Sequence, residues 1–330
     1  MVSLILNVKT FCLIPIFLFV FAAEPGAATT VYVTSLKDSG RGSLREAVSR
    51  GNRRIEFKVG GEIKLRKMIE LRAHDVVIDG KSAPRPGITI TGSPFWVRDV
   101  RDVTLRHLRF RMSSDDNLRI SGACQNLLVE NCSSTHGGDG AIDITLDYKT
   151  KKRPNGVTIR NCLIAATDKA MLVVGADNLT LEGNLFTNTG QRNPQLHDAR
   201  NFNLFNNVVR NFTVYGFRAR AGSTGNAVAN LYPLSPLLPK RPDRTFLVDH
   251  KSGACRVHAS GNVGPTEHDP NRQGNSSRPI GKLPRQRLSV SSLERSLSSR
   301  VGAQPLDRID AALVKNDPAI KFRESRTKDK

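Results

Sequence analysis

Acidic side chains gather in two short segments near the middle of the chain. Asp115 and Asp116 are adjacent. Asp139 and Asp143 are separated by Gly-Ala-Ile. Carboxylates this close repel one another unless a cation joins them, and oxygen ligands on loops suit Ca²⁺ better than a transition metal. The two segments therefore form a candidate calcium site. Solvated aspartates at loop corners are the alternative, which spacing alone leaves open.

Two basic residues follow further along the chain. Lys169 opens the segment Lys-Ala-Met-Leu-Val-Val-Gly, and Arg192 opens Arg-Asn-Pro-Gln-Leu-His. Charged side chains are seldom buried in an apolar core, so both should project from the outer surface. Either one alone reads equally well as a solvated surface charge. If the fold brings both beside the aspartates, the acids, an ammonium and a guanidinium together make a site for an anionic polymer.

The element that must position these residues is a short β-rich segment that recurs along the chain. Each copy has alternating apolar residues and ends in Asn, Gly or His, and the copies span residues 103–107, 127–131, 157–161, 179–183, 202–206 and 226–230. Their closing residues are 24, 30, 22, 23 and 24 positions apart. A strand unit with such a period cannot bury its apolar face alone and must stack on its neighbours as a solenoid.

The predicted fold is all-β, a right-handed parallel β-helix. Asn and Gly tolerate the left-handed backbone region, so the closing residue should bend every coil at the same corner. We expect Asn131, Asn161, Asn206 and Asn230 to stack there. Strands of adjacent coils lie about 4.8 Å apart, which would place the acidic and basic segments within roughly 10–15 Å of one another.

The remaining segments divide the chain into three parts. Residues 1–28 read as a signal peptide, whose apolar run from 11 to 23 is too short to span a bilayer comfortably. Residues 29–240 are expected to form the β-helix, opened by a short capping helix in which Ser43 and Glu46 form a capping box. Residues 241–330 should be a basic, loop-rich extension with a weak helix near 291–315.

Charge and cysteine content limit the partners. The net charge is +20, which favours polyanions, and with four Tyr, one Trp and no nucleic-acid-binding motif we expect an acidic polysaccharide and no nucleic acid. No segment after residues 1–28 is apolar enough for stable membrane insertion, so we expect a secreted protein. We also expect it to be a monomer. Cys132 and Cys162 hold the same place in consecutive repeats. An exported protein can form disulfides, but we favour free buried thiols here.

Six segments of the chain, taken together, resemble the conserved motifs of one known protein family. They are Ser39-Gly-Arg-Gly-Ser-Leu-Arg-Glu-Ala47, Asp116-Asn-Leu-Arg-Ile120, Asp139-Gly-Ala-Ile-Asp143, Lys169-Ala-Met-Leu-Val-Val-Gly175, Arg192-Asn-Pro194 and Val301-Gly-Ala-Gln-Pro-Leu-Asp-Arg-Ile-Asp-Ala311. In this order and at this spacing they resemble motifs of the pectate lyase family, polysaccharide lyases with a right-handed parallel β-helix. The resemblance covers about residues 30–315.

The resemblance implies a Ca²⁺-dependent lyase that cleaves polygalacturonate, or pectate, by β-elimination. In that family Ca²⁺ bridges protein carboxylates and substrate uronates and acidifies the proton on C5. An arginine removes this proton, and elimination at C4 gives a 4,5-unsaturated product. By position, Arg192 would be the base, and Lys169 would be the second catalytic residue, holding a substrate carboxylate. The implied calcium ligands are Asp116, Asp139 and Asp143.

Two residues of the implied substrate-binding set depart from the family pattern. Gln195 and His197 stand where the family places further arginines. The change at Gln195 is mild, since members vary there, whereas His197 removes a guanidinium that would grip the substrate carboxylate. Two other functions stay open. One is a non-catalytic module that binds anionic polysaccharide. The other is a β-helix hydrolase, although hydrolysis needs a pair of acids that we find only in the segments assigned to calcium.

Overall fold

The computed structural model describes residues 28–238, 240–249, 255–283 and 288–316. The predicted signal peptide lies outside this part of the chain, except for Ala28. Within the described residues, no helix is both long and apolar enough to cross a lipid bilayer.

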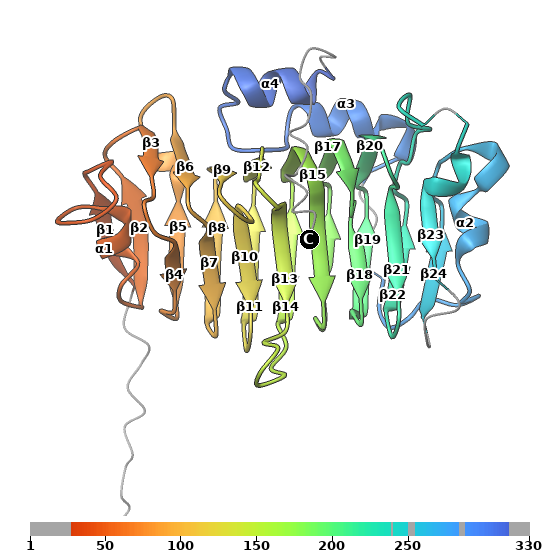
Figure 1. Ribbon diagram of the computed structural model, residues 1–330, viewed down its shortest axis with the longest axis horizontal. Helices are drawn as coiled ribbons and strands as arrows, with labels where there is room; N and C mark the ends of the chain where they lie inside the picture. Colours follow the sequence, from red (N-terminus) through yellow and green to blue (C-terminus); the bar gives the residue numbers. More distant parts are fainter. Residues whose placement is uncertain (1–27, 239, 250–254, 284–287, 317–330) are drawn as a thin grey trace, which may run out of the picture.

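The described chain winds into a stack of coils built mainly from parallel strands (Figure 1). The first sheet is a parallel ladder with one strand from each coil. In spatial order its strands are β1 (Thr29–Val33), β2 (Arg53–Phe57), β5 (Val76–Asp79), β8 (Arg101–Arg106), β11 (Gln125–Glu130), β14 (Asn155–Arg160), β16 (Thr180–Glu182), β19 (Arg200–Phe205), β22 (Thr224–Val228) and β24 (Arg256–Ser260).

The second sheet has an upper and a lower row of strands, as Figure 1 is drawn, and β15 (Leu163–Val174) is long enough to belong to both. The upper row also holds β3 (Gly61–Lys64), β6 (Ile88–Gly92), β9 (Leu108–Ser113), β12 (Ser133–Thr135), β17 (Leu185–Gln191) and β20 (Val208–Phe212). The lower row also holds β4 (Ile69–Leu71), β7 (Phe95–Arg98), β10 (Leu118–Ser121), β13 (Gly140–Thr145), β18 (Gln195–His197), β21 (Phe217–Arg220) and β23 (Phe246–Val248). The predicted parallel β-helix is confirmed.

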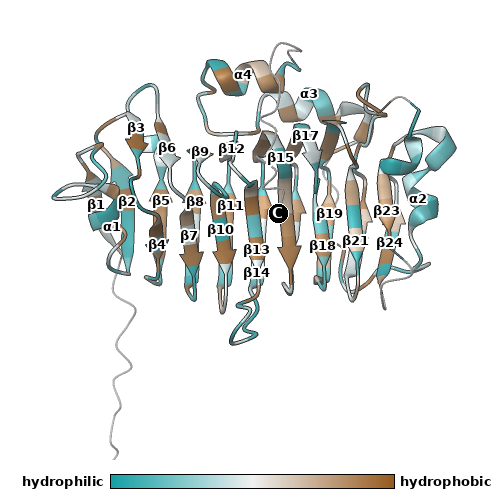
Figure 2. Cartoon of the chain, viewed as in Figure 1, coloured by the Kyte–Doolittle hydropathy of each residue, from teal (hydrophilic) through white to brown (hydrophobic). Residues whose placement is uncertain are grey.

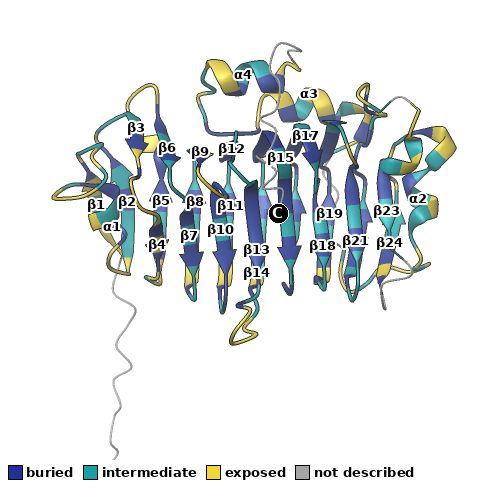
Figure 3. Cartoon of the chain, in the orientation of Figure 1, coloured by how far each residue is buried: buried dark blue, intermediate teal, exposed yellow. Residues whose placement is uncertain are grey.

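Alternation of apolar and polar residues builds the core of the stack. The inward residues of β8, Val103 and Leu105, pair in register with Leu127 and Val129 of β11, and all four are at most 3% exposed. Inward apolar side chains of successive coils therefore stack on one another. The brown segments of Figure 2 and the dark blue segments of Figure 3 show this pattern along the strands. Removal of this apolar surface from water is the main force that holds the coils together.

The corner after the first sheet uses the left-handed backbone region, as the repeat predicted. Asn131, Asn161 and Asn206 have φ angles of 49°, 50° and 55°. The prediction is wrong for Asn230, because Ala229 carries the positive φ in that coil, at 53°. The bend falls one residue earlier than the closing asparagine, so the repeat alone misplaced the corner there.

Asn230 instead belongs to a ladder of buried asparagines one position beyond the corner. Asn184, Asn207, Asn230 and Asn262 are each at most 5% exposed. The Nδ2 of each of the first three donates to the Oδ1 of the next at 3.0 Å. Each Oδ1 from Asn207 onward also accepts the backbone N–H of the preceding ladder residue at 3.0 Å. The ladder satisfies backbone groups that the corner would otherwise leave unpaired in the core.

Cys132 and Cys162 occupy the ladder position in the two preceding coils. The backbone N–H of Cys162 donates to Asn184 Oδ1 at 2.9 Å, which joins this coil to the ladder. Both thiols are buried and free, so the prediction of free cysteines is confirmed. Burial raises the pKa of the Cys132 thiol, which keeps it protonated and unreactive.

Replacing Asn207 by Ala should lower the free energy of unfolding by about 2–4 kcal/mol. The backbone N–H of Asn184 and the carbonyl of Leu181 would both lose their partner inside the core. Chemical denaturation followed by circular dichroism measures the loss. Asn155→Ala is the matched control, since Asn155 is exposed and accepts a hydrogen bond from the exposed Asn178. Equal losses for the two variants would show that the ladder adds no stability.

A short helix closes the N-terminal end of the stack, as predicted. α1 (Leu44–Ala47) is capped by Ser43, whose Oγ accepts the backbone N–H of Glu46 at 3.2 Å. The Glu46 carboxylate accepts the N–H of Gly42 at 2.5 Å, one residue before the N-cap that a capping box normally uses. Leu44 and Ala47 are buried in the main core, so the helix covers the open end of the first coil.

The β-helix extends past the boundary predicted at residue 240. β23 pairs with β21, and β24 pairs with β22, so one further coil follows the Pro-rich connection. That connection lengthens the coil and obscures the period, which is why the sequence pattern ended too early. The short helical turns between the larger elements are η1 (Gly80–Ser82), η2 (Pro242–Arg244), η3 (Thr266–His268), α2 (Pro270–Gln273) and η4 (Val290–Ser292).

The weak helix predicted near 291–315 corresponds to two short helices that lie against the upper row (Figure 1). They are α3 (Leu293–Ser298) and α4 (Arg308–Val314). Leu293, Leu297 and Leu313 are buried in one apolar cluster with Leu163 and Leu185 of the β-helix. The end of the described chain therefore covers the side of the stack and does not extend away from it.

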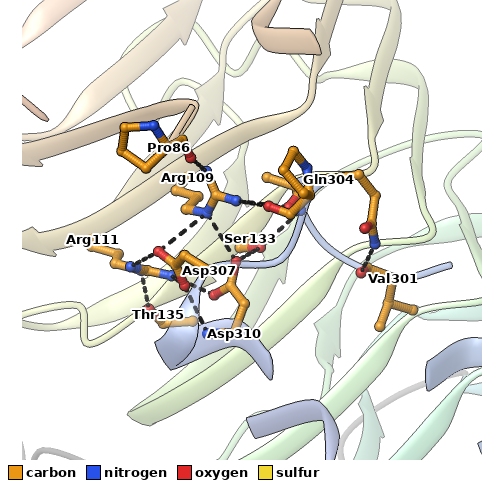
Figure 4. Close-up of polar contacts among 11 residues, drawn as sticks. Pro86, Arg109, Arg111, Ser133, Thr135, Val301, Gln304, Asp307 and Asp310 are labelled. Carbon is orange, nitrogen blue, oxygen red and sulfur yellow. Dashed lines mark hydrogen bonds and ion pairs between the residues drawn. The ribbon is translucent and has the colours of Figure 1, made fainter. Parts of the chain in front are cut away.

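Two buried arginines hold α4 on the upper row (Figure 4). Arg109 and Arg111 of β9 are 1% and 4% exposed. Arg111 donates two hydrogen bonds to Asp307, of 2.7 and 2.9 Å, and Arg109 Nε donates to Asp310 Oδ2 at 3.2 Å. Asp310 also accepts from the Ser133 hydroxyl at 2.7 Å. These buried charges are tolerated because each one is paired and hydrogen-bonded.

Replacing Asp310 by Ala should lower the free energy of unfolding by about 3–5 kcal/mol, because two guanidinium groups would stay buried beside a single carboxylate. Urea denaturation at neutral pH measures the loss. Asp243→Ala is the control, since Asp243 is 51% exposed in a surface ion pair with Arg241. Such surface pairs contribute about 0–1 kcal/mol. A loss at Asp310 no larger than that of the control would contradict the role of this contact.

Candidate functional site

The acidic residues meet in the loops that lead from the upper to the lower row. Asp115 and Asp116 precede β10, and Asp139 precedes β13. One carboxylate oxygen from each of the three lies within 4.8 Å of the other two. The predicted ligands Asp116 and Asp139 are thus brought together, and Asp115, which the resemblance did not assign, joins them. We refer to these three residues as the acidic cluster.

Asp143, the third predicted ligand, borders the same space from β13. A Cβ atom on Gly140 would lie 2.6 Å from Asp116 Oδ1 and 3.3 Å from Asp143 Oδ1, so both carboxylates approach one point. A side chain at Gly140 would displace Asp116, and glycine is therefore needed at this position. Asp143 Oδ1 also accepts the backbone N–H of Leu172 at 3.2 Å, which fixes its orientation.

Burial and mutual repulsion disfavour the charged forms of these carboxylates. Burial, followed by the charges of Asp143, Asp115 and Asp139, raises the pKa of Asp116 to about 8. Burial also raises the pKa of Asp143 to about 6, although the positive charge of Arg192 opposes this shift. Asp116 is 4% exposed, and its Oδ1 is buried without a hydrogen-bond partner in the described part of the chain. Oxygen ligands that lack counter-charge in this way fit a divalent cation.

Lys169 lies in β15 beside Gly140 in the strand ladder. Its ammonium forms an ion pair with Asp139, and its side chain remains 25% exposed. The structure therefore brings this predicted residue to the acidic cluster, where it contacts a protein carboxylate. To hold a substrate carboxylate, Lys169 would have to exchange Asp139 for the substrate.

Arg192 lies between β17 and β18, one coil after Lys169. Its φ of 61° is rare for a bulky residue, and its carbonyl accepts the N–H of Met171 at 2.7 Å, which ties this turn to β15. Its positive charge acts on Asp143. Among the described residues its guanidinium forms no salt bridge, so this predicted residue lies at the site with its donors available.

Gln195 and His197 lie on the outward side of β18, and their ladder partners in the next coil are Arg218 and Arg220 of β21. The Tyr215 hydroxyl donates to Gln195 Oε1, which fixes the amide. The guanidinium groups that the family pattern would place at 195 and 197 are therefore present one coil further on, about 4.8 Å away. Sequence reasoning missed both, although Arg-Ala-Arg follows Gln-Leu-His by 23 residues, the usual period of the repeat.

Sequence reasoning also missed Arg119, on the outer face of β10. Its ladder partners are Trp96 in β7 and Asp143 in β13. Alternation within Asn-Leu-Arg-Ile could have placed Arg119 opposite the buried Leu118 and Ile120. Coil by coil, one row on the outer face of the lower strands holds Trp96, Arg119, Asp143, Leu172, Gln195 and Arg218.

Comparison with known sequences finds similar proteins. A family model described as a right-handed β-helix region matches residues 87–232. A probable pectate lyase C of Aspergillus oryzae is 32% identical over 219 residues, which are 63% of this chain and 50% of that protein. A probable pectate lyase C of Aspergillus fumigatus is 32% identical over 208 residues, 60% of this chain and 47% of that protein. The chain thus spans about half the length of the curated relatives it matches.

Solved structures share the fold. Jun a 1, the major allergen from cedar pollen, has a TM-score of 0.65 and 18% identity, covering 84% of this chain and 89% of that chain. The pectate lyase Bsp165PelA from Bacillus sp. N165, in complex with trigalacturonate, has a TM-score of 0.65 and 14% identity, covering 84% and 94%. At these identities the likeness shows the fold alone. Together with the sequence relatives, it confirms the resemblance: the chain is a right-handed parallel β-helix protein related in sequence to pectate lyases.

Proposed function

We propose that this protein is a Ca²⁺-dependent pectate lyase that cleaves polygalacturonate, or a closely related polyuronate, by β-elimination. The observation that carries the proposal is the crowding of Asp116 and Asp143 around one point, with too little protein counter-charge. Beside them lie Lys169 and Arg192, and Arg192 forms no salt bridge within the described residues. Sequence similarity to proteins named pectate lyases supports it, as does the trigalacturonate bound to a protein of the same fold.

The residues available to hold calcium are Asp115, Asp116, Asp139 and Asp143. They supply oxygen ligands from two loops and one strand, which is the ligand type Ca²⁺ prefers. The unpartnered Oδ1 of Asp116 fits this assignment. When bound, the ion would withdraw electron density from a uronate unit of the substrate and so make the proton on C5 more acidic.

Lys169 then binds the substrate, and Arg192 removes the proton. Lys169 releases Asp139 and binds the substrate carboxylate. Arg192 takes the C5 proton, the electron pair forms the C4–C5 double bond, and the C4–O bond breaks so that the leaving oxygen takes up a proton. An arginine is normally too basic for this step. Neighbouring positive charge and loss of water under the substrate favour the neutral form of a basic group.

Arg192→Lys should lower the rate of unsaturated product formation from polygalacturonate by at least about 100-fold, because a positioned base of this kind contributes about 10²–10⁴ to the rate. The assay follows the ultraviolet absorbance of the 4,5-unsaturated uronide. Arg200→Lys is the control, since Arg200 is 59% exposed and lies in β19 of the first sheet, where it pairs with Asp198. A fully active Arg192→Lys variant would remove this residue from the mechanism.

Calcium and pH should act together on stability. The folded-state pKa values of Asp116 and Asp143 are raised to about 8 and about 6, so the folded protein binds more protons than the unfolded chain between their ordinary values and these. Without calcium, stability should fall as pH rises through this range. Added Ca²⁺ should restore it, most strongly above pH 8, where both carboxylates are ionised.

Thermal unfolding across pH, with Ca²⁺ and with a chelator, tests this prediction. Asp116→Asn should flatten the pH dependence and weaken the calcium effect, because it removes the most strongly shifted carboxylate. Asp102→Asn is a matched control, since its carboxylate is 45% exposed on the first sheet. A calcium effect that is unchanged in Asp116→Asn would place the ion elsewhere.

A second function, binding of anionic polysaccharide without catalysis, is favoured by His197, which replaces an expected arginine. Arg218 and Arg220 in the adjoining coil weaken that argument, because they supply guanidinium groups nearby. Retention on polygalacturonate with no unsaturated product would support the binding module, and new reducing ends without unsaturation would support a hydrolase.

We also propose that the protein is exported, on the basis of residues 1–28. Sequencing the N-terminus of protein recovered from culture medium tests export.

A further inference from the structure

Arg119 lies on the outer face of the lower row, immediately beside the candidate site. It pairs in register with Asp143 of β13 on one side and with Trp96 of β7 on the other. Its strand neighbours Leu118 and Ile120 are fully buried, so alternation directs the Arg119 side chain outward. Arg119 is thus three residues after Asp116 in the same coil, and one coil from Asp143, toward the N-terminal end of the stack.

The single tryptophan of the chain braces this arginine. Arg119 Cζ lies 5.2 Å from the centre of the Trp96 ring, within the range of a cation–π contact. The indole N–H donates to Ser121 Oγ at 2.6 Å, which fixes the orientation of the ring. Within the described residues, the guanidinium is therefore held in place by an aromatic surface and not by a carboxylate.

A second arginine, Arg98, also contacts the Trp96 ring, but unlike Arg119 it is paired with a carboxylate among the described residues. Arg98 Cζ lies 4.9 Å from the Trp96 ring, and Arg98 also donates to Asp147 at 2.7 Å. Arg119 forms no salt bridge within the described residues, and its Nε is buried without a hydrogen-bond partner there. A preorganised guanidinium with unused donors is suited to binding a carboxylate in a bidentate manner.

The unused donors do not serve the protein's own acids. The charge of Arg119 acts on Asp116 and Asp143, but no hydrogen bond joins it to either within the described structure. If these acids hold calcium as proposed, Arg119 remains available for an anion from outside. The proposed base Arg192 precedes β18, three coils from Arg119 and therefore roughly 14 Å away, so that anion would belong to a different unit of the same chain from the one that reacts.

We propose that Arg119 is a substrate-positioning residue, which binds the carboxylate of a neighbouring uronate unit while Trp96 holds its guanidinium in place. This inference rests on the proposed function and deepens it. It assigns the surface over β10 and β7 to the continuing polymer, so the preferred substrate is a polyuronate that extends beyond the acidic cluster toward the N-terminal end.

The test compares polygalacturonate binding with calcium binding, by titration calorimetry in the Arg192→Lys background so that the polymer is not consumed. Adding Arg119→Ala should weaken polygalacturonate binding by roughly 10- to 100-fold, because charge-assisted hydrogen bonds to the uronate are lost. Calcium affinity without polymer should hold or rise, because a positive charge beside the acidic site has been removed. Arg119→Lys should give an intermediate loss of polymer binding, because it keeps the charge but not the planar fork.

Arg72→Ala is the matched control, since Arg72 is 51% exposed on the same side of the stack and already pairs with Glu70 and Asp99. It should leave both affinities unchanged. Trp96→Leu should lower polymer binding less than Arg119→Ala does, while sparing calcium binding.

Three outcomes would overturn the inference. Unchanged polymer affinity in Arg119→Ala would show that this residue does not meet the substrate. A parallel loss of calcium and polymer binding would show that it only maintains the structure. Absence of polygalacturonate binding in the parent protein, with calcium bound normally, would overturn the proposed function and this inference together. The first two results leave the proposed function intact.

Discussion

The register of the parallel strands between coils is the constraint on which the rest of this structure depends. It holds residues that are far apart in the chain at one strand spacing, about 4.8 Å, as with Arg119 and Asp143. A slip of one residue would turn Asp143 into the core and bring the buried Ile142 to the surface. The polar site is therefore positioned by backbone hydrogen bonds and core packing. Its own carboxylates oppose that arrangement, since they repel one another.

The β-helix contains two groups of buried charge that are handled in opposite ways. The buried carboxylate of Asp310 forms ion pairs with Arg109 and Arg111, and these pairs stabilise the fold. Asp116 is nearly as buried, but one of its oxygens has no hydrogen-bond partner among the described residues, and three other carboxylates lie nearby. The first group ties the C-terminal helices to the stack. The second group repels itself unless a proton or a cation neutralises it, and this contrast is why we propose it as a cation site.

Much of the fold and part of the site could be predicted from local patterns. The strand repeat predicted the solenoid, and Asp116, Asp139, Asp143 and Lys169 come together as the spacing indicated. Prediction failed where a local pattern has two readings. Asn230 looks like a corner residue but lies in the internal ladder, because the bend falls at Ala229. The boundary at residue 240 was too early, because a long connection hides the last coil.

The sequence by itself determined the type of coil, the approximate place of each bend and the residue types that approach the site, because these follow from alternation and period within one segment. Only the tertiary structure decided which side chains are paired. Arg119 rests on Trp96 and forms no salt bridge in the described part of the chain, and Arg218 stands beside Gln195. Both arrangements depend on the register between segments about 23 residues apart. No single segment encodes that register, because it is set by the joint packing and hydrogen bonding of neighbouring coils.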